Sequence, residues 1–351
     1  MKLGIIGKPQ SGKSTIFNAV SGMNVAVGDF YQASHRAIIK VPDDRIDRLS
    51  EIVNPKKMTY AEIDFLDSPG FTGKGKASEK FEINPEIKLM DALVMVVDMF
   101  SEDTDDVSAE IEALVDEMLL SDMTVLESNI EKKSKKQRVT GSKEEQAELE
   151  LLKQCYEKLE NNIPLIEVDL DRSQQKMIRG YTFLTMKPLL IVINLKEDNI
   201  PKAEEIINNH RQFVSCGKRE IIALCGKIEA ELSELEEEER KMFMSELGIK
   251  KPAVDLLIQK SYSLLGLISF LTAGEPEVRA WTIKKGTNAQ KSAGVIHSDI
   301  ERGFIRAEVT KYEDYVTYKT ASALKSAGKT RLEGKEYIVC DGDVILFRFN
   351  V

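Results

Sequence analysis

The sequence has few of the residues that build metal centres, disulfide frameworks or membrane spans. It holds four cysteines and three histidines among 351 residues, and no two cysteines have the C-x-x-C spacing of a zinc or redox motif. No apolar stretch is long enough to cross a bilayer, and the first predicted strand stands where a secretory signal would be. We therefore expect a cytoplasmic protein without a disulfide framework, a zinc site or a membrane span.

The composition is that of an ordinary globular protein. Hydrophobic residues make up 42% and charged residues 30% of the chain, and the length suggests roughly two to three domains. The formal net charge of −9 argues against a protein that coats nucleic acid, although it leaves room for a local basic patch.

A complete phosphate-binding loop lies at the N-terminus. Residues 7–14 read G-K-P-Q-S-G-K-S, between the apolar run 3–6 and the helical pattern of 15–20. This order aims backbone N–H groups and a helix N-terminus at a phosphate chain. Lys13 would reach the β- and γ-phosphates and Ser14 would hold Mg²⁺. A chance glycine turn would not combine this spacing with a strand and a helix.

Short apolar runs recur along the first part of the chain and predict an α/β fold. Near-continuous β-branched runs of this kind are typical of a parallel sheet that is covered on both faces. We expect a doubly wound nucleotide-binding domain over 1–100 and 187–266, with the ligand beyond the carboxyl ends of the strands. The runs lie at 63–66, 93–97, 189–193 and 221–224.

Two further elements follow predicted strands. Asp67-Ser68-Pro69-Gly70 matches the D-x-x-G element of GTPase-like proteins, in which Asp67 would hold Mg²⁺ through a water molecule and the Gly70 N–H would sense the γ-phosphate. The pattern alone is weak, and a plain turn is the alternative. Its position one strand after the phosphate loop favours the functional interpretation.

The segment 194–197 stands where a guanine-specific protein would have N-K-x-D. It reads Asn194-Leu195-Lys196-Glu197, so the aspartate that would accept two hydrogen bonds from guanine is replaced by Glu197. This replacement weakens the case for guanine specificity. After the next strand, Cys225 begins a segment that would contact the base through its backbone, although an inert buried thiol is an equally simple interpretation.

A helical insertion is predicted over 101–186. Val107, Ile111, Leu114 and Met118 keep helical spacing, and a second pattern follows a polar break at 139–143. Two helices that fold back as an antiparallel coiled-coil hairpin explain both patterns. The hairpin tip would carry the densest basic cluster of the chain, which is either a solvated turn or an RNA or ribosome contact. The cluster consists of Lys132, Lys133, Lys135, Lys136 and Arg138.

A third unit is expected over 267–351. The segments 278–283, 303–309 and 343–349 alternate as strands, and a small mixed sheet of ubiquitin-like size would accommodate them. No catalytic constellation is evident in this unit, which favours a binding module.

The combination of these features resembles the YchF/Obg-like ATPase family. The phosphate loop, the N-x-x-E element at 194–197, the helical insertion and the C-terminal strands together cover nearly the whole chain, and the last unit is similar to the TGS domain of that family. The resemblance implies a P-loop protein of GTPase fold that prefers ATP to GTP, hydrolyses it slowly and associates with ribosomes or translation factors.

The sequence departs from the family pattern around the nucleotide. Gln10 and Ser11 replace an Asn-Val pair in the loop, and the segment expected to supply a threonine, 29–35, has none. Phe71 stands where Ras-like proteins have a water-positioning glutamine. We therefore expect slow hydrolysis, because groups that position the attacking water are missing.

We assign catalytic roles to Lys13, Asp67 and Gly70 and metal binding to Ser14 and Asp67. The nucleotide-binding set is Gln10, Ser11, Gly12, Lys13, Ser14, Thr15, Asn194, Leu195, Glu197 and Cys225.

The leading hypothesis is a slow, Mg²⁺-dependent ATPase switch that acts on the ribosome or the translation machinery. Nucleotide-dependent changes around 29–36 and 68–82 would alter how the hairpin and the TGS unit are presented to a translation partner. A non-hydrolysing scaffold that nucleotide stabilises and that binds RNA or protein is one alternative, and a conventional GTPase is another. The oligomeric state does not follow from the sequence.

Overall fold

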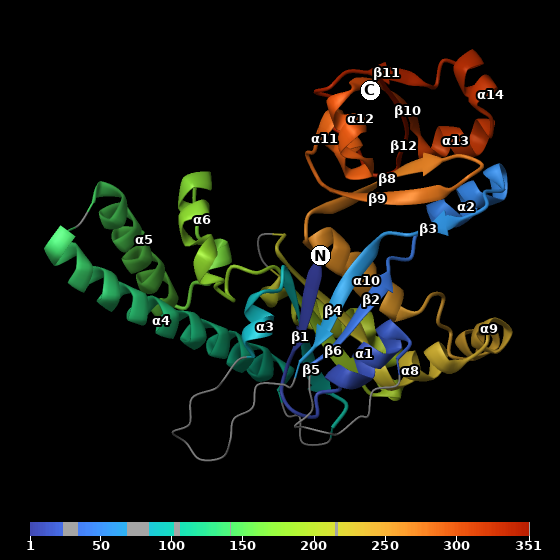
Figure 1. Ribbon diagram of the computed structural model, residues 1–351. Helices are drawn as coiled ribbons and strands as arrows, with labels where there is room; N and C mark the ends of the chain where they lie inside the picture. The colour runs from blue at the N-terminus through green and yellow to red at the C-terminus, as the bar shows by residue number, and fades with distance from the viewer. Residues whose placement is uncertain (24–33, 69–83, 102–105, 141, 215–216, 351) are drawn as a thin grey trace. The chain divides into compact units, whose positions relative to one another are not determined.

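The computed structural model describes residues 1–23, 34–68, 84–101, 106–140, 142–214 and 217–350 (Figure 1). The chain divides into two compact units: Met1–Ile38 with Asp64–Leu257, and Ile39–Ile63 with Ile258–Val351. Residues 39–63 thus belong to the same unit as the C-terminal strands, which the sequence did not indicate. The division into three domains, with bounds at 101–186 and 267–351, stays a prediction.

The first unit is built on a six-stranded sheet with the order β2-β4-β1-β5-β6-β7. The pairings of β1 with β4 and β5, of β5 with β6 and of β6 with β7 are parallel. This confirms the predicted parallel sheet and brings the carboxyl ends of these strands to one edge. The strands are β1 (Lys2–Ile6), β2 (His35–Lys40), β4 (Glu62–Asp67), β5 (Ala92–Met99), β6 (Leu189–Leu195) and β7 (Arg219–Leu224).

Helices cover this sheet and extend it. The predicted stripe Val107, Ile111, Leu114 and Met118 is buried in one cluster with residues of β5 and β6, because these positions share one helix face. The helices are α1 (Lys13–Ser21), α3 (Pro85–Lys88), α4 (Val107–Thr140), α5 (Lys143–Glu160), α6 (Arg172–Ile178), α7 (Ala203–Asn209), α8 (Gly226–Glu234) and α9 (Glu237–Glu246), with short 3-10 turns that include η3 (Glu197–Lys202).

The helices α4 and α5 form the predicted hairpin (Figure 1). Ser142 caps α5 in a reciprocal arrangement with Glu145, which explains why the chain turns at this point. Leu126, Leu152 and Cys155 are among the buried residues that hold the hairpin together. Burial raises the pKa of the Cys155 thiol to about 11, so this cysteine acts as a small apolar side chain.

The second unit contains a mixed six-stranded sheet with the order β11-β10-β12-β8-β9-β3. The predicted strands correspond to β9, β10 and β12, which confirms a small mixed sheet. The strands are β3 (Met58–Thr59), β8 (Leu267–Ala273), β9 (Val278–Lys284), β10 (Phe304–Lys311), β11 (Arg331–Glu333) and β12 (Asp343–Phe349). The helices are α2 (Asp44–Val53), α11 (Ala289–Ile296), α12 (Ser298–Arg302), α13 (Tyr312–Tyr318) and α14 (Ala321–Ser326), and α10 (Ala253–Leu264) crosses the boundary between the units.

A three-way polar contact joins α2 to the C-terminal sheet. The Arg45 guanidinium donates to Asp43 and to Asp341 at 2.8 Å each, and the other Asp341 oxygen accepts from the Ser269 N–H at 2.8 Å. This contact places residues 39–63 with the C-terminal strands although they are more than 200 positions away in the chain. In the described part of the chain, no helix has the length and apolar character needed to cross a membrane.

Asp122 fixes α4 to the segment that leads into β6. Its side chain is 1% exposed, and its carboxylate accepts from the Leu184 N–H, the Thr185 N–H and the Thr185 hydroxyl at 2.9, 2.8 and 2.7 Å. Burial raises the pKa of this carboxyl group, and the three donors oppose the rise. The hairpin is thus anchored at its base by one buried acid.

We predict that Asp122→Ala leaves two buried amides without acceptors. Amide exchange at Leu184 and Thr185 should accelerate about 10- to 100-fold, because an unpaired buried donor costs about 1–3 kcal/mol. Hydrogen exchange measured by mass spectrometry would test this, with Asp169→Ala at a nearby exposed aspartate as the control. Equal exchange rates in the two variants would contradict the anchoring role.

Candidate nucleotide-binding site

The loop between β1 and α1 has the backbone that phosphate binding requires. Gly12 has a φ of 89° and precedes the first residue of α1, so the loop turns sharply into the helix N-terminus. A Cβ atom at this position would lie 2.1 Å from the Asn194 amide nitrogen. Both the conformation and the space therefore demand glycine. Gln10 is exposed in the same loop, and Ser11 is buried.

Lys13 is held inside this loop. Its ammonium group donates to the Lys8 carbonyl at 2.5 Å, and the residue is 7% exposed. Burial lowers the pKa of Lys13 to about 8, while the nearby Asp67 and Glu110 carboxylates oppose that shift. A phosphate chain would offer this buried cation stronger acceptors than a single carbonyl oxygen.

Ser14 and Asp67 meet at the ends of α1 and β4. The Ser14 hydroxyl donates to one Asp67 oxygen at 2.9 Å, and Asp67 is 5% exposed. The other Asp67 oxygen is buried and has no hydrogen-bond partner among the described residues. Burial raises the pKa of Asp67, so the ionised form is short of stabilising partners. A hydroxyl beside an unsatisfied carboxylate oxygen fits a hard cation such as Mg²⁺.

Asn194 forms two hydrogen bonds to the backbone beside the phosphate loop. Its amide nitrogen donates to the Ser11 carbonyl at 3.1 Å, and its amide oxygen accepts from the Gly226 N–H at 2.9 Å. The side chain is 4% exposed. One amide therefore joins the phosphate loop, the end of β6 and the start of α8, and the role predicted for Asn194 in nucleotide binding stays a prediction.

A cavity of about 450 Å³ lies beside the loop at the ends of β5, β6 and β7. It brings together Thr15, Leu195, Glu197 and Cys225 of the predicted set, as the parallel sheet requires. Leu195 is 1% exposed and belongs to the core, and Glu197 is exposed at the start of η3. The cavity is lined by Gly12, Thr15, Phe100, Asn194, Leu195, Lys196, Glu197, Asp198, Cys225 and Lys227.

Cys225 is the residue before α8. It is 5% exposed, and burial is the main cause that raises the pKa of its thiol. A protonated thiol in this position contributes shape rather than reactivity. Gly70, Phe71, most of 68–82 and residues 29–33 lie outside the described residues, so the roles predicted for them stay predictions.

Glu110 is a site residue that the sequence interpretation missed. It lies in the first turn of α4, is 7% exposed, and one of its carboxylate oxygens has no hydrogen-bond partner in the described part of the chain. Burial raises the pKa of Glu110, while Lys8 and Lys13 lower it, which places this carboxyl group in the field of the phosphate loop. No sequence signal singles it out, because acidic residues are frequent throughout α4.

Phe100 was also missed. It follows β5 and is 36% exposed at the cavity. The rule that residues after parallel strands face the ligand could have found it.

Strand, phosphate loop, hydroxyl–carboxylate pair and base-side cavity together define a P-loop nucleotide-binding protein. Residues 2–128 match a family model described as "50S ribosome-binding GTPase". Residues 267–350 match the model YchF-GTPase_C, described as "Protein of unknown function (DUF933)".

Similar proteins match over the whole length of the chain. The "Ribosome-binding ATPase YchF" of Bacillus subtilis (strain 168) is 42% identical over 99% of both chains. The protein of the same name from Escherichia coli O157:H7 is 36% identical over 100% of this chain and 99% of its own length. The solved structure of the Schizosaccharomyces pombe YchF GTPase has a TM-score of 0.83 at 30% identity, with 99% of this chain and 97% of that chain covered. The chain belongs to the YchF family.

We predict that Asn194→Ala weakens ATP and GTP binding alike, by about tenfold each, because two hydrogen bonds that position the phosphate loop are lost. The ratio of the two dissociation constants should stay within about twofold. Titration calorimetry would measure both constants, with Asn199→Ala as a control at a half-buried asparagine. A variant that binds the triphosphate normally but no longer distinguishes the bases would show that Asn194 contacts the base.

Proposed function

We propose that this protein is a nucleotide-dependent switch that binds ATP with Mg²⁺, hydrolyses it slowly and acts on the ribosome. The observation that carries the proposal is the convergence of Lys13, Ser14 and Asp67 at the carboxyl edge of the sheet. The names of the curated relatives, ribosome-binding ATPases, agree with it. The proposal places the protein in the cytoplasm, where its partner is found.

The residues would divide the chemistry among them. The loop N–H groups and the α1 N-terminus bind the phosphates, and Lys13 exchanges the Lys8 carbonyl for phosphate oxygens. Ser14 and Asp67 would hold Mg²⁺, which neutralises phosphate charge when it is bound. Glu110 balances the charge of Lys13 when no phosphate is present. Phosphoryl transfer needs mainly such positioning and charge stabilisation.

The proposed preference for ATP over GTP rests on the residues at the base cavity. Asn194 uses both polar atoms of its amide on the backbone, and Leu195 is buried where an N-K-x-D protein has a lysine. Glu197 carries a longer side chain than the aspartate that pairs with guanine. The curated relatives are named ATPases and the fission-yeast protein is titled a GTPase, so the preference is part of the proposal.

Turnover of ATP tests the enzymatic part. The wild-type chain should release ADP slowly, faster with ribosomes, and Lys13→Ala should reduce release about 100-fold or more because a buried phosphate ligand is lost. Lys2→Ala, at an exposed lysine on β1, serves as the control.

Wild-type turnover that stays at background with and without ribosomes would contradict the enzyme. Tight ATP binding in that case would leave the alternative of a nucleotide-stabilised scaffold. Faster turnover of GTP than of ATP would instead indicate a conventional GTPase.

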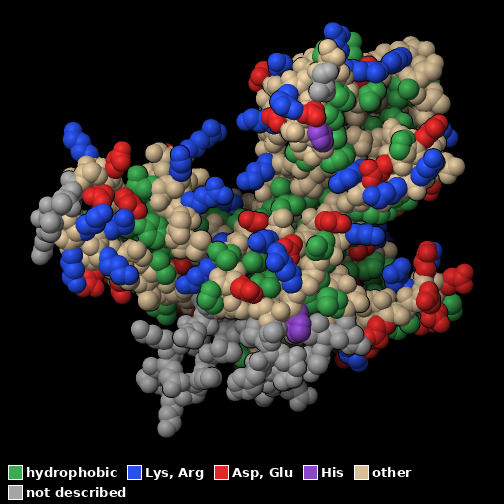
Figure 2. All heavy atoms as spheres, in the orientation of Figure 1, with side chains coloured by type: hydrophobic (Ala, Val, Ile, Leu, Met, Phe, Trp, Pro, Cys, Tyr) green, Lys and Arg blue, Asp and Glu red, His purple; other side chains and the backbone are tan. Residues whose placement is uncertain are grey.

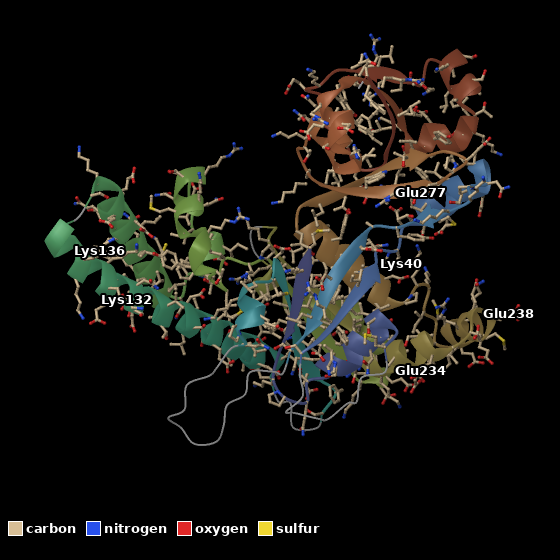
Figure 3. The ribbon with its side chains drawn as sticks, in the orientation of Figure 1. Lys40, Lys132, Lys136, Glu234, Glu238 and Glu277 are labelled. Atoms are coloured by element: carbon tan, nitrogen blue, oxygen red, sulfur yellow. The ribbon has the colours of Figure 1, made fainter. Side chains whose placement is uncertain are left out.

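The basic tip of the hairpin is the proposed ribosome contact. Lys133, Lys135 and Lys136 form ion pairs with Glu148, Glu131 and Glu145 at 2.7, 2.6 and 2.7 Å. Lys132 is exposed and has no ion pair among the described residues (Figure 3). Figure 2 shows positive and negative side chains interspersed over this region. Ion pairs of exposed lysines contribute little, so Lys135 and Lys136 can still turn to phosphate groups.

We predict that Lys132→Gln combined with Lys136→Gln weakens ribosome binding and reduces its salt dependence, because two phosphate contacts are lost. Co-sedimentation at increasing salt concentrations would measure the effect. The matched control is Lys241→Gln with Lys250→Gln, which also removes one paired and one exposed lysine. If both double variants bind as the wild type does, the tip is only a solvated turn.

A further inference from the structure

The sheet of the second unit has a gap between two of its strands. β12 pairs with β10 from Phe304↔Phe349 to Lys311↔Asp343. Among the residues that the structure describes, it pairs with β8 only at its start, where Val344 lies opposite Leu271 and the preceding Gly342 N–H donates to the Ser269 carbonyl. β8 ends at Ala273, and the chain then turns into β9. Within the described residues, the outer half of β12 therefore has a strand on one side only.

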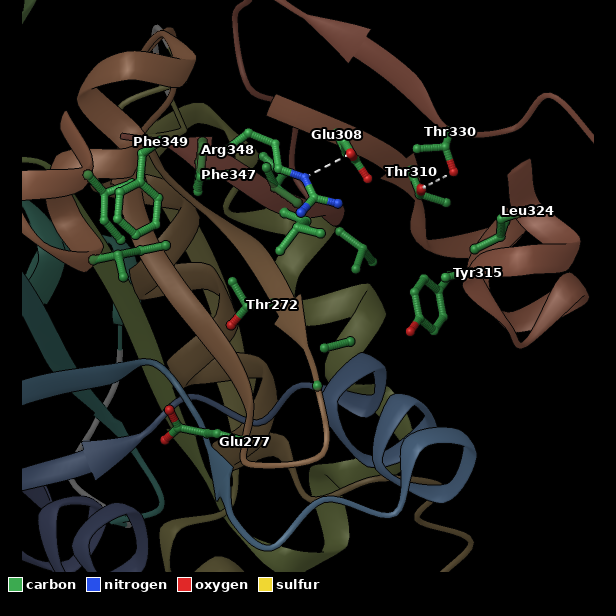
Figure 4. A pocket seen from close by; sticks show the side chains of 18 of the residues that line it. Thr272, Glu277, Glu308, Thr310, Tyr315, Leu324, Thr330, Phe347, Arg348 and Phe349 are labelled. Atoms are coloured by element: carbon green, nitrogen blue, oxygen red, sulfur yellow. Dashed lines mark hydrogen bonds and ion pairs between the residues drawn. The ribbon is translucent and has the colours of Figure 1, made fainter. Parts of the chain in front are cut away.

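A cavity of about 500 Å³ lies where these two strands part (Figure 4). Its walls include Thr272 at the end of β8, Tyr315 of α13 and Leu324 of α14, together with the outer half of β12. The volume is within the range of about 300–1,000 Å³ for ligand sites. All residues that line it belong to the second unit, so the cavity is complete in that unit.

The cavity reaches both faces of the sheet. Leu346 and Arg348 project on the face covered by α13 and α14, and Phe347 projects on the opposite face with Ile300. Side chains of a strand alternate between faces in the same way. An extended peptide beside β12 could therefore place its alternate side chains on the two faces of the sheet.

Two carboxylates, Glu277 and Glu308, and two cations, Lys325 and Arg348, line the cavity. Glu277 forms ion pairs with Lys57 at 3.4 Å and Arg279 at 3.9 Å, which lie outside the lining, so Glu308 is left to the two cations. Glu308 accepts from Arg348 at 2.9 Å and lies 3.8 Å from the Lys325 ammonium, and Arg348 lowers the pKa of this carboxyl group. Two half-exposed cations thus share one carboxylate. The Tyr315 hydroxyl also lacks a hydrogen-bond partner among the described residues. An added carboxylate would be favoured beside Arg348 and Lys325.

We propose that this cavity is a docking site for an extended acidic–hydrophobic peptide of a partner protein, which adds a strand along the free edge of β12. Main-chain hydrogen bonds to β12 give affinity, and alternate side chains give specificity. On the face of α13 and α14, an apolar side chain packs on Leu346, which is 52% exposed, and an Asp or Glu two residues away meets Arg348. The residue between them enters the gap beside Ile300.

The peptide acetyl-Thr-Glu-Val-Val-Val-Glu-Thr-amide tests this site, because its pattern is the same in either strand direction. We expect saturable binding of a fluorescent version to the full chain in anisotropy titrations. A peptide with lysine in place of both glutamates should bind at least tenfold more weakly. Proline in place of the two outer valines removes main-chain donors and should abolish binding.

Two variants of the protein locate the site. Leu346→Asp should weaken binding at least tenfold, and Arg348→Gln about fivefold with a smaller salt dependence. Ile338→Asp changes a residue as exposed as Leu346, and Arg302→Gln changes an arginine that is more exposed than Arg348; both lie outside the cavity and should bind as the wild type does.

Three results would overturn the proposal: absence of binding up to millimolar peptide, equal binding of the proline peptide, or equal binding by the Leu346→Asp variant. The proposal would also be overturned if octanoate bound to the cavity and none of the peptides displaced it, since the cavity would then take a small carboxylic acid.

Discussion

The Asn194 amide is the interaction on which the nucleotide site depends. It lies near the end of β6, between β5 and the edge strand β7, and bonds to the phosphate loop on one side and to the start of α8 on the other. Gly12 has to be a glycine because this amide occupies the space where a side chain would begin. One buried side chain therefore contributes both to the loop geometry and to the wall of the base cavity. Asn194, which we predicted to bind the nucleotide, thus also connects these segments of the backbone.

The charges around the Asn194 amide are buried and only partly compensated. Lys13, Asp67 and Glu110 are each less than 10% exposed, and the pKa values of all three shift towards the neutral form because of burial. Asp67 and Glu110 each keep an oxygen without a partner among the described residues. A cation and a phosphate chain would satisfy these groups together, so binding of one should favour binding of the other.

Elements that are marked by a pattern within a short segment could be predicted from the sequence. The phosphate loop, the parallel strands and the two hairpin helices were predicted near their observed bounds, because glycine spacing, β-branched runs and helical periodicity are properties of short segments. The inclusion of residues 39–63 in the second unit was not predictable, since it depends on Arg45 meeting Asp341. Glu110 was missed for the same reason, because its importance comes from burial next to Lys13. The gap beside β12 likewise arises from pairing between distant strands.

The most direct test of this account is a crystal structure of the protein with Mg²⁺ and a non-hydrolysable ATP analogue. We expect Asn194 to keep its bonds to the Ser11 carbonyl and the Gly226 N–H, while the Lys13 ammonium leaves the Lys8 carbonyl for the β- and γ-phosphates. The metal should lie beside Ser14 and Asp67. An Asn194 side chain turned to the adenine edge, with the phosphate loop held in another way, would contradict the central claim.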